Sequence, residues 1–224
     1  MIHALPRRRA KLVPLAAAVV AIALYVVLDP PWVAVSIEKA NSGSAVAGSQ
    51  NLSPDKYVAS IWTSKVLPTV RSSAVDLTTL LRDLQKNQAA ASKRYGHYSV
   101  LNSPPAFLIK GSGRIVSVNT LSLISKVGVA LGASKKPDVF IQIGPIISGT
   151  DVRDALPFVN FNQFVNQVQF GEVAIAFNSK VRETALAKLN PAKLKDKHVT
   201  FTGAFTYSSP KDVLITPITF EVGK

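Results

Sequence analysis

Cysteine is absent from this 224-residue chain, and histidine and methionine are scarce, with three residues and one. The lack of cysteine excludes disulfide bonds, thiolate metal ligands, a cysteine nucleophile and a lipid-modified N-terminal cysteine. His97 and His198 have no partner at metal-ligand spacing, and His3 lies in the basic N-terminus. We therefore predict no metal site.

Motifs for nucleotide binding and for nucleophilic catalysis are also missing. No Rossmann or Walker loop and no G-x-S-x-G nucleophile elbow occurs, and residues 132–136 (GASKK) lack both the glycine spacing and the Lys-Ser/Thr ending of a phosphate loop. Asp151 and Asp154 are a conceivable carboxylate pair for glycoside hydrolysis. Their position around Arg153 is explained more simply by ion pairing and helix capping. We predict a protein without a cofactor that is not an enzyme.

Acidic residues are few: 13 Asp and Glu stand against 26 Lys and Arg. Four of the basic residues lie within residues 1–11, where there are no acids, so the rest of the chain has 22 basic residues and a net charge of +9. Such an excess favours an anionic membrane surface, an anionic polymer or nucleic acid. The basic residues are spread out and are not interleaved with aromatics, which predicts a solvated basic surface and disfavours nucleic acid as a partner.

The N-terminal region contains a 17-residue run without charge, residues 12–28. As a helix it spans about 26 Å, slightly less than the roughly 30 Å hydrocarbon core of a bilayer. The basic cluster before it predicts a cytoplasmic N-terminus. A cleaved signal peptide is the alternative, but the clean A-x-A site lies far downstream, at residues 45–47. We therefore favour an uncleaved anchor in the inner membrane with the bulk of the chain in the periplasm.

The rest of the chain divides by composition. We predict a cytoplasmic basic N-terminus (1–11), a transmembrane anchor (12–28), a flexible Ser/Gly/Ala-rich tether (29–52), a helical unit (53–106) and a β-barrel domain (107–224).

Two helices are expected in the helical unit. The first begins at Ser53, whose hydroxyl and the following proline are typical of a helix start, and it ends at Pro68. The second extends from about Val75 to Tyr95, with a stripe of leucines as its apolar face. Both helices need a further surface on which to bury their apolar faces.

From residue 107 the periodicity changes to that of strands. We predict a hairpin of strands 107–110 and 114–119 around Gly111-Ser112-Gly113, then a connection that includes Gly128 and Gly132. A third strand is predicted over residues 138–147.

A helical segment follows, opening at Pro157 and Asn160 and kinked at Gly171, with Phe161, Phe164, Val165 and Val168 on one face. It stops at Asn190-Pro191, and strands 198–205 and 213–220 close the chain.

The resulting order of elements is strand, strand, strand, helix, strand, strand. Five short strands with a long helix between the third and the fourth are the OB-fold order, so we predict an α+β protein with an OB-like five-stranded barrel. Gly203, inside the fourth strand, is expected to form the bend or bulge that closes such a barrel. An open antiparallel sheet packed on helices is the alternative.

Polar residues are concentrated in an otherwise apolar stretch, residues 139–170. The candidate binding residues are Gln142, Thr150, Asp151, Arg153, Asp154, Asn162 and Asn166. In one interpretation they cap turns and pair with one another. In the other they line a polar groove for a sugar or a partner loop, since amides, carboxylates and guanidinium groups suit hydroxyl-rich ligands. Gln142 faces either solvent or an inner polar site, and the alternation does not decide between them.

Several segments resemble a bacterial family. They are residues 61–68 (IWTSKVLP), 75–77 (VDL), 95–96 (YG), 111–118 (GSGRIVSV), 142–147 (QIGPII), 149–150 (GT), 153–158 (RDALPF), 161–164 (FNQF), 199–205 (VTFTGAF) and 215–217 (ITP). Through these segments the chain, over about residues 53–223, resembles the predicted periplasmic lipoproteins of domain of unknown function 2291. The resemblance implies an extracytoplasmic, membrane-tethered protein without an established activity, often encoded beside sugar ABC-transporter components. Many members have a lipobox cysteine, and this chain has none, which leaves the hydrophobic segment as its anchor.

Three functional hypotheses follow. The first is a membrane-anchored extracytoplasmic accessory or binding protein that serves sugar uptake, with ABC-transporter subunits or a sugar-binding protein as partners. The second is an OB-fold binder of nucleic acid or another anionic polymer. The third is an envelope hydrolase.

Overall fold

The computed structural model describes residues 53–100, 103–207, 209 and 213–223. The predicted cytoplasmic segment, anchor and tether lie outside these residues. Within the described ranges, no helix is both long enough and apolar enough to cross a lipid bilayer.

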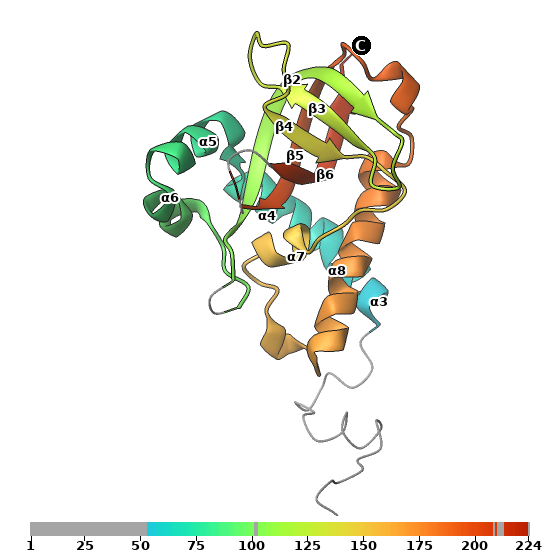
Figure 1. The fold of residues 1–224 in the computed structure, drawn as a ribbon. Helices are drawn as coiled ribbons and strands as arrows, with labels where there is room; N and C mark the ends of the chain where they lie inside the picture. The colour runs from blue at the N-terminus through green and yellow to red at the C-terminus, as the bar shows by residue number, and fades with distance from the viewer. Residues whose placement is uncertain (1–52, 101–102, 208, 210–212, 224) are drawn as a thin grey trace, which may run out of the picture. The chain divides into compact units, whose positions relative to one another are not determined.

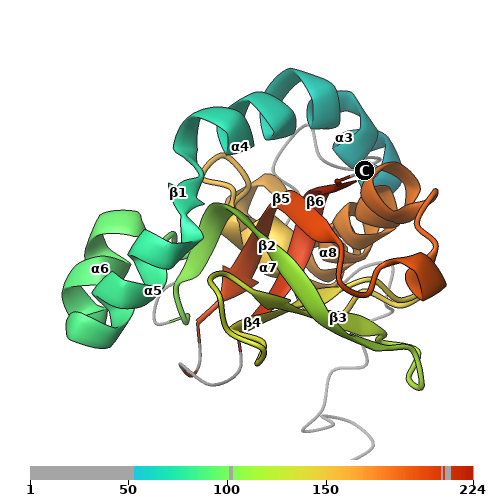
Figure 2. The same cartoon turned by 90° about the horizontal axis from the view of Figure 1, so that it is seen from above.

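Five strands close into a barrel (Figure 1, Figure 2). They are β2 (Ala106–Asn119), β3 (Lys126–Ala130), β4 (Val139–Gln142), β5 (His198–Thr206) and β6 (Leu214–Val222). β2 pairs antiparallel with both β3 and β5, β3 pairs antiparallel with β4, β4 pairs parallel with β6, and β5 pairs antiparallel with β6. This circuit confirms the predicted closed barrel with OB-fold strand order. The bulge expected at Gly203 is also confirmed, because the register of β5 on β6 shifts between Thr202 and Gly203.

The predicted hairpin at Gly111-Ser112-Gly113 is wrong. β2 continues through these residues as one 14-residue strand, pairing along its first part with β5 and along its last part with β3. Gly113 is needed for close approach rather than for a turn, since a Cβ atom there would lie 2.4 Å from the carbonyl oxygen of Ala130. Glycine inside a strand often marks such an approach of two backbones.

The next two strands also differ from the prediction. The segment taken as a connection around Gly128 is strand β3, and the third predicted strand ends at Gln142 instead of Ile147. Ile143 N still donates to Ser125 O, 2.8 Å away, which continues the antiparallel register of Gln142 on Lys126 by one residue. The barrel therefore has the predicted five strands, although two predicted strands merge into one and β3 was missed.

The N-terminal helical segment is longer than predicted. Helix α3 (Pro54–Ile61), the π-helical turn η1 (Trp62–Val66) and helix α4 (Leu67–Ser73) follow one another without a break. The expectation that Pro68 ends the helix is wrong. The π-helical turn changes the hydrogen-bonding register just before this proline, so the proline occupies the first turn of α4, where a missing N–H is tolerated.

The second predicted helix, Val75 to Tyr95, is divided. Val75 belongs to a two-residue strand, β1 (Val75–Asp76), which pairs parallel with β2. Helices α5 (Leu77–Lys86) and α6 (Gln88–Tyr95) follow. The side chains of Asp76 and Asn87 each accept a hydrogen bond from the backbone amide three residues on, so each starts a new helix.

The region between β4 and β5 contains several helical segments instead of one. They are α7 (Asp151–Ala155), the 3₁₀ turn η2 (Phe161–Gln163), α8 (Gln167–Val181), the π-helical turn η3 (Arg182–Leu186) and the 3₁₀ turn η4 (Pro191–Lys193). The long helix begins at Gln167 rather than near Asn160 and extends through Gly171 without interruption. Val168, predicted on the buried face, is 70% exposed.

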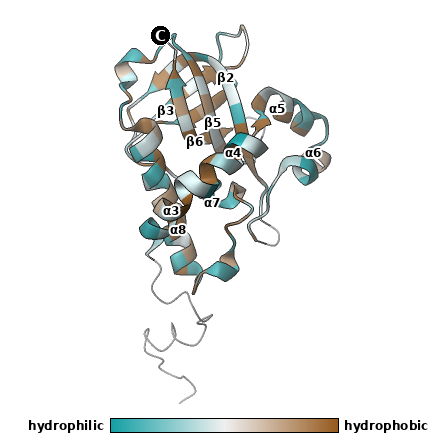
Figure 3. Cartoon of the chain, turned by 180° about the vertical axis from the view of Figure 1, so that it is seen from behind, coloured by the Kyte–Doolittle hydropathy of each residue, from teal (hydrophilic) through white to brown (hydrophobic). Residues whose placement is uncertain are grey.

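One hydrophobic core joins the helices to the barrel. Phe107 and Phe205 stack inside the barrel with their ring centroids 5.4 Å apart. The ring centroids of Trp62 and of Phe177 in α8 lie 6.4 Å apart. Helix α3 packs along α8, and α7 contacts both α8 and the barrel strands (Figure 1). Hydrophobic residues recur along the strands and along α3 and α4 in Figure 3. The segment 53–76 thus shares its core with the barrel.

Candidate functional site

Asp151 is the first residue of α7, and its carboxylate contacts the end of β5 and the beginning of β6. Its Oδ1 accepts a hydrogen bond from Thr206 Oγ1 at 2.7 Å, and its Oδ2 accepts one from Thr216 Oγ1 at 3.0 Å. Burial raises the pKa of the Asp151 carboxyl above its ordinary value of 3.8, and the hydrogen bonds from Thr206 and Thr216 oppose this shift. The carboxylate thus ties α7 to two barrel strands.

Gln142 extends the same network into the barrel, where it is fully buried. Its Nε2 donates to Thr216 Oγ1 at 2.9 Å and to Ser148 O at 3.0 Å, and its Oε1 accepts from Ser148 N at 2.9 Å. The side chain therefore faces an inner polar site, which settles the alternative that the sequence left open. Its amide holds the segment after β4 against β6.

Arg153 connects α7 to α8. Its Nε and Nη2 donate to Asp154 Oδ1 at 2.8 Å and 2.7 Å, and its Nη1 donates to Phe170 O at 2.9 Å. The guanidinium also lies over the Phe170 ring, 3.7 Å from its centroid. Thr150 Oγ1 donates to the other oxygen of Asp154. Arg153 is buried, and its donors face a carboxylate, a carbonyl and an aromatic ring within the protein.

The two asparagines of the predicted cluster lie farther along the chain. Asn162 is exposed in the 3₁₀ turn η2. Asn166 is the N-cap of α8, where its side chain accepts a hydrogen bond from Gln169 N at 2.9 Å. The structure therefore brings Gln142, Thr150, Asp151, Arg153 and Asp154 into one region and places the asparagines outside it.

Other residues of this network were not found from the sequence. Asn178 of α8 donates to Gly149 O at 2.9 Å and to Ile147 O at 3.3 Å. His97 Nδ1 lies 2.6 Å from Asp154 O. Asn178 was detectable in principle as a polar residue on the apolar face of a helix. His97 was not, since 57 positions separate it from its partner.

Together these contacts make the segment 142–154 a closed polar cluster, which we call the inner cluster. The side chains of Gln142, Asp151 and Arg153 find hydrogen-bonding partners within the protein, as buried polar groups require. Their role as ligand contacts stays a prediction. Among the described residues, no group of three or more His, Asp or Glu side chains is placed to hold a metal ion.

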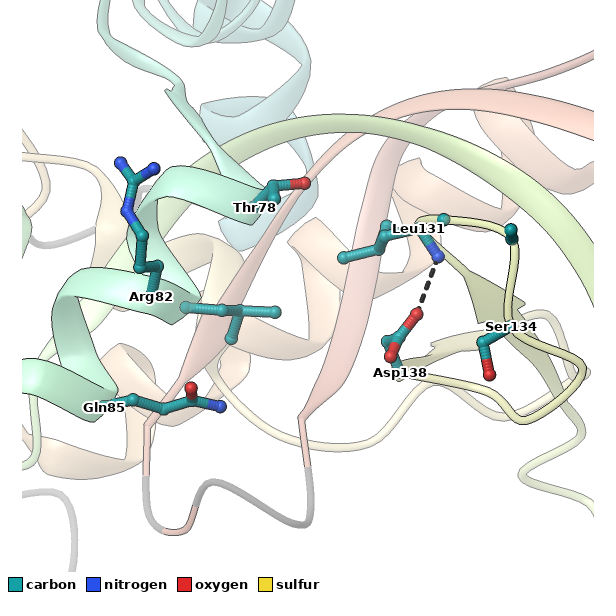
Figure 4. Close-up of a pocket in the computed structure, with 9 residues that line it drawn as sticks. Thr78, Arg82, Gln85, Leu131, Ser134 and Asp138 are labelled. Atoms are coloured by element: carbon teal, nitrogen blue, oxygen red, sulfur yellow. Dashed lines mark hydrogen bonds between the residues drawn. The ribbon is translucent and has the colours of Figure 1, made fainter.

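A different region offers accessible chemistry: a groove between α5 and the β3–β4 connection (Figure 4). Its volume is about 410 Å³. Helix α5 contributes Thr78, Leu81, Arg82 and Gln85, which share one helix face. Residues 131–134 and Asp138 form the opposite wall.

The wall formed by the β3–β4 connection is held in place by hydrogen bonds. Leu131 N donates to Asp138 Oδ2 at 2.8 Å, the bond drawn in Figure 4. Arg114 Nη2 donates to Ser134 O at 3.2 Å. One wall of the groove thus carries a guanidinium, an amide and a hydroxyl group from α5, and the other wall is the hydrogen-bonded β3–β4 connection. The sequence did not reveal it, because its two walls are more than 40 positions apart.

The chain has an OB-fold barrel and belongs to a family of predicted periplasmic lipoproteins. The family described as "Predicted periplasmic lipoprotein (DUF2291)" matches residues 20–221. Membership supports an extracytoplasmic location, and the description names no enzymatic activity. A crystal structure of an OB-fold protein from Thermotoga maritima MSB8 is similar to this chain at 18% identity with a TM-score of 0.61, covering 78% of this chain and 100% of that one. No curated protein matches the sequence.

Proposed function

We propose that this protein is a membrane-anchored, extracytoplasmic accessory protein that binds a protein partner through the α5 groove and serves sugar uptake. The observation that carries the proposal is the contrast between the two polar regions. The buried side chains of the inner cluster are hydrogen-bonded to partners within the protein, whereas Arg82 and Gln85 on the groove wall are exposed. Exposed polar groups at a hollow between two separate elements suit recognition of another molecule.

The groove fits a segment of a protein partner better than it fits catalysis. It contains one carboxylate, Asp138, which is engaged by a backbone amide of its own loop. Arg82 lies 3.6 Å from Asp83 with 70% of its side chain exposed, so it is free to reach a partner's carboxylate or carbonyl groups. Transporter subunits and a sugar-binding protein are the partners that the family resemblance implies.

Photo-crosslinking tests the proposal. A photoreactive amino acid replaces Gln85 in the tagged full-length chain, produced in the bacterium that encodes it, and the same residue at the exposed Lys188 is the control. We expect crosslinks from position 85 to an ABC-transporter subunit or a sugar-binding protein, above the level at position 188. No such partner at position 85 above that control would contradict the proposal.

The proposed anchor is the apolar segment 12–28, retained in the mature protein. It takes the place of a lipid-modified cysteine, since the sequence contains none. N-terminal sequencing of the membrane fraction tests this. We expect the original N-terminus on a product near 24.0 kDa. A mature chain that begins after Ala34 or Ala47 would show cleavage instead.

Binding of an anionic polymer is a second candidate, favoured by one observation. Lys126 Nζ lies over the ring of Phe140, 4.4 Å from its centroid, so neighbouring strands β3 and β4 carry a basic–aromatic pair. Base stacking on aromatics beside basic groups is how OB folds bind single strands. A salt titration with single-stranded DNA decides: phosphate contacts give a steep salt dependence, and undetectable binding at low salt eliminates this candidate.

A further inference from the structure

The loop between β2 and β3 exposes aliphatic side chains to an unusual degree. Leu121 is 98% exposed, Leu123 65% and Ile124 38%, and Ile146 of the β4–α7 loop is 46% exposed. Ile146 N donates to Leu123 O at 3.1 Å, so the two loops lie side by side. We call residues 120–125 with Ile146 the aliphatic loop. Large exposed aliphatic groups gathered at one point mark an interaction site.

Part of the backbone of this loop is hydrogen-bonded within the loop. Leu121 N donates to Asn119 Oδ1 at 3.1 Å, and Ile124 N donates to Ser122 Oγ at 3.2 Å. Ser125 Oγ donates to Ser122 O at 2.7 Å. Moving backbone groups into an apolar medium is costly unless they are hydrogen-bonded. This loop therefore presents hydrocarbon outward at a reduced desolvation cost.

The aliphatic loop also packs closely against the β4–α7 loop. Gly144 lies against its backbone, and a Cβ atom there would be 2.4 Å from both Leu123 O and Ser125 N. Two backbones can approach this closely only because residue 144 has no side chain. The backbone that carries the exposed aliphatic groups is thus packed closely against the β4–α7 loop.

Positive charge borders the aliphatic loop. Lys126 follows it directly, and Arg182 Nη1 donates to Pro145 O at 2.9 Å, next to Ile146. Within residues 119–150 the only carboxylate is Asp138, which follows the opposite end of β3. Glu172 of α8 and Glu183, which pairs with Lys180, are the acids on the neighbouring helical segments. An aliphatic tip with adjacent cations is complementary to the surface of a bilayer that contains anionic lipid.

We propose that the aliphatic loop inserts into the anionic lipid surface to which the protein is anchored. The inference rests on the anchoring in the proposed function. Residues 29–52, which link the apolar segment to the described residues, span at most about 80 Å, so the domain stays within reach of the bilayer. A few aliphatic side chains fall short of the roughly 1,600 Å² of a standard protein interface.

The absence of cysteine makes a direct test simple. Leu121→Cys introduces a single attachment point for a nitroxide label in the full chain. Ala133→Cys is the control, since it is exposed in the connection after the opposite end of β3. Both labelled chains are reconstituted into phosphatidylethanolamine–phosphatidylglycerol vesicles. Power-saturation measurements then compare collisions of the label with oxygen, which concentrates in lipid, and with a water-soluble nickel chelate.

At position 121 we expect an oxygen-to-nickel ratio severalfold above that at position 133, and a fall in this ratio when phosphatidylcholine replaces the anionic lipid. Equal ratios at the two positions would overturn the inference while leaving the anchor intact. Shielding of position 121 from both reagents would overturn it in favour of a second copy of the chain or another protein. If carbonate washing removes the chain from the vesicles, the anchoring itself fails and the inference falls with it.

Discussion

The inner cluster and the aliphatic loop reverse the usual relation between polarity and burial. Gln142 and Arg153 are polar and buried, whereas Leu121 and Leu123 are apolar and exposed. The polar residues are explained by contacts inside the protein, since Arg153 alone joins a carboxylate, a backbone carbonyl and an aromatic ring. The exposed leucines have no comparable internal explanation. The comparison teaches that a density of polar residues in a sequence does not by itself locate a functional surface.

The largest expected effect comes from Arg153→Ala. The substitution removes both bonds to Asp154 and the bond to Phe170 O, and it leaves a largely buried carboxylate without its cation. We expect a loss of about 3 kcal/mol in the free energy of unfolding and a melting temperature lower by roughly 5–10 °C. Urea and thermal unfolding measure it, with the exposed Arg71→Ala as the control, expected within about 0.5 kcal/mol of wild type. Unchanged melting combined with lost crosslinking at position 85 would instead make the turn at Arg153 functional.

Substitution of Gly144, against which the aliphatic loop packs, is expected to lower the free energy of unfolding nearly as much. Gly144→Ala places a methyl group against Leu123 O and Ser125 N and should cost about 2 kcal/mol. Gly171→Ala is the matched control: nothing lies within 4 Å of its Cβ position, and alanine in a helix gains up to about 1 kcal/mol over glycine. Equal stabilities of the two variants would mean that the backbone of residues 123–125 adjusts to the added methyl group at little cost. Chemical denaturation of both proteins gives the answer.

Asp151 gives the inner cluster a defined pH dependence. Because burial raises its pKa above 3.8, the folded chain binds a proton at this carboxyl more readily than the unfolded chain does. Its contribution to stability is therefore highest below the unfolded pKa and decreases as the pH rises through the folded pKa. Asp151→Asn removes this titration. The free energy of unfolding of the wild type minus that of the variant should fall across the acidic range and level off above it; a difference that rises with pH would show that the carboxylate is favoured as an anion.

The smallest effect on stability is expected from Leu121→Ser. With 98% of the residue already exposed, little apolar surface is lost on substitution, and the free energy of unfolding should change by less than about 0.5 kcal/mol. Association of the loop with lipid should nevertheless weaken. A large loss of stability would show that Leu121 is packed in solution and would remove the contrast with Arg153.

The sequence predicted the topology better than the details. The order of strands and helix identified the OB fold, yet the glycines at 111 and 113 indicated a turn where β2 needs close backbone approach to β3. A short-range pattern does not distinguish the two, because the neighbour that requires Gly113 is Ala130, on another strand. The same applies to Pro68, which the π-helical turn before it accommodates.

The candidate site shows a similar limit. The sequence located the polar residues around Arg153 and favoured ion pairing, and the structure pairs Arg153 with its neighbour Asp154. The partners Thr206, Thr216 and Asn178 come from distant elements and could not be inferred from spacing. Exposure of Leu121 was equally hidden, since alternating Leu and Ser in a short run is also typical of a half-buried strand.

Hydrogen–deuterium exchange of the full chain tests the contrast between the two regions most directly. Peptides covering residues 119–125 and 147–156 are compared in detergent and in phosphatidylglycerol-containing vesicles. We predict slow exchange of 147–156 in both media, because Ser148 N and Asp154 N are bonded within the inner cluster and α7. For 119–125 we predict slower exchange in vesicles than in detergent. Fast exchange of 147–156, together with exchange of 119–125 that is the same in both media, would contradict the account.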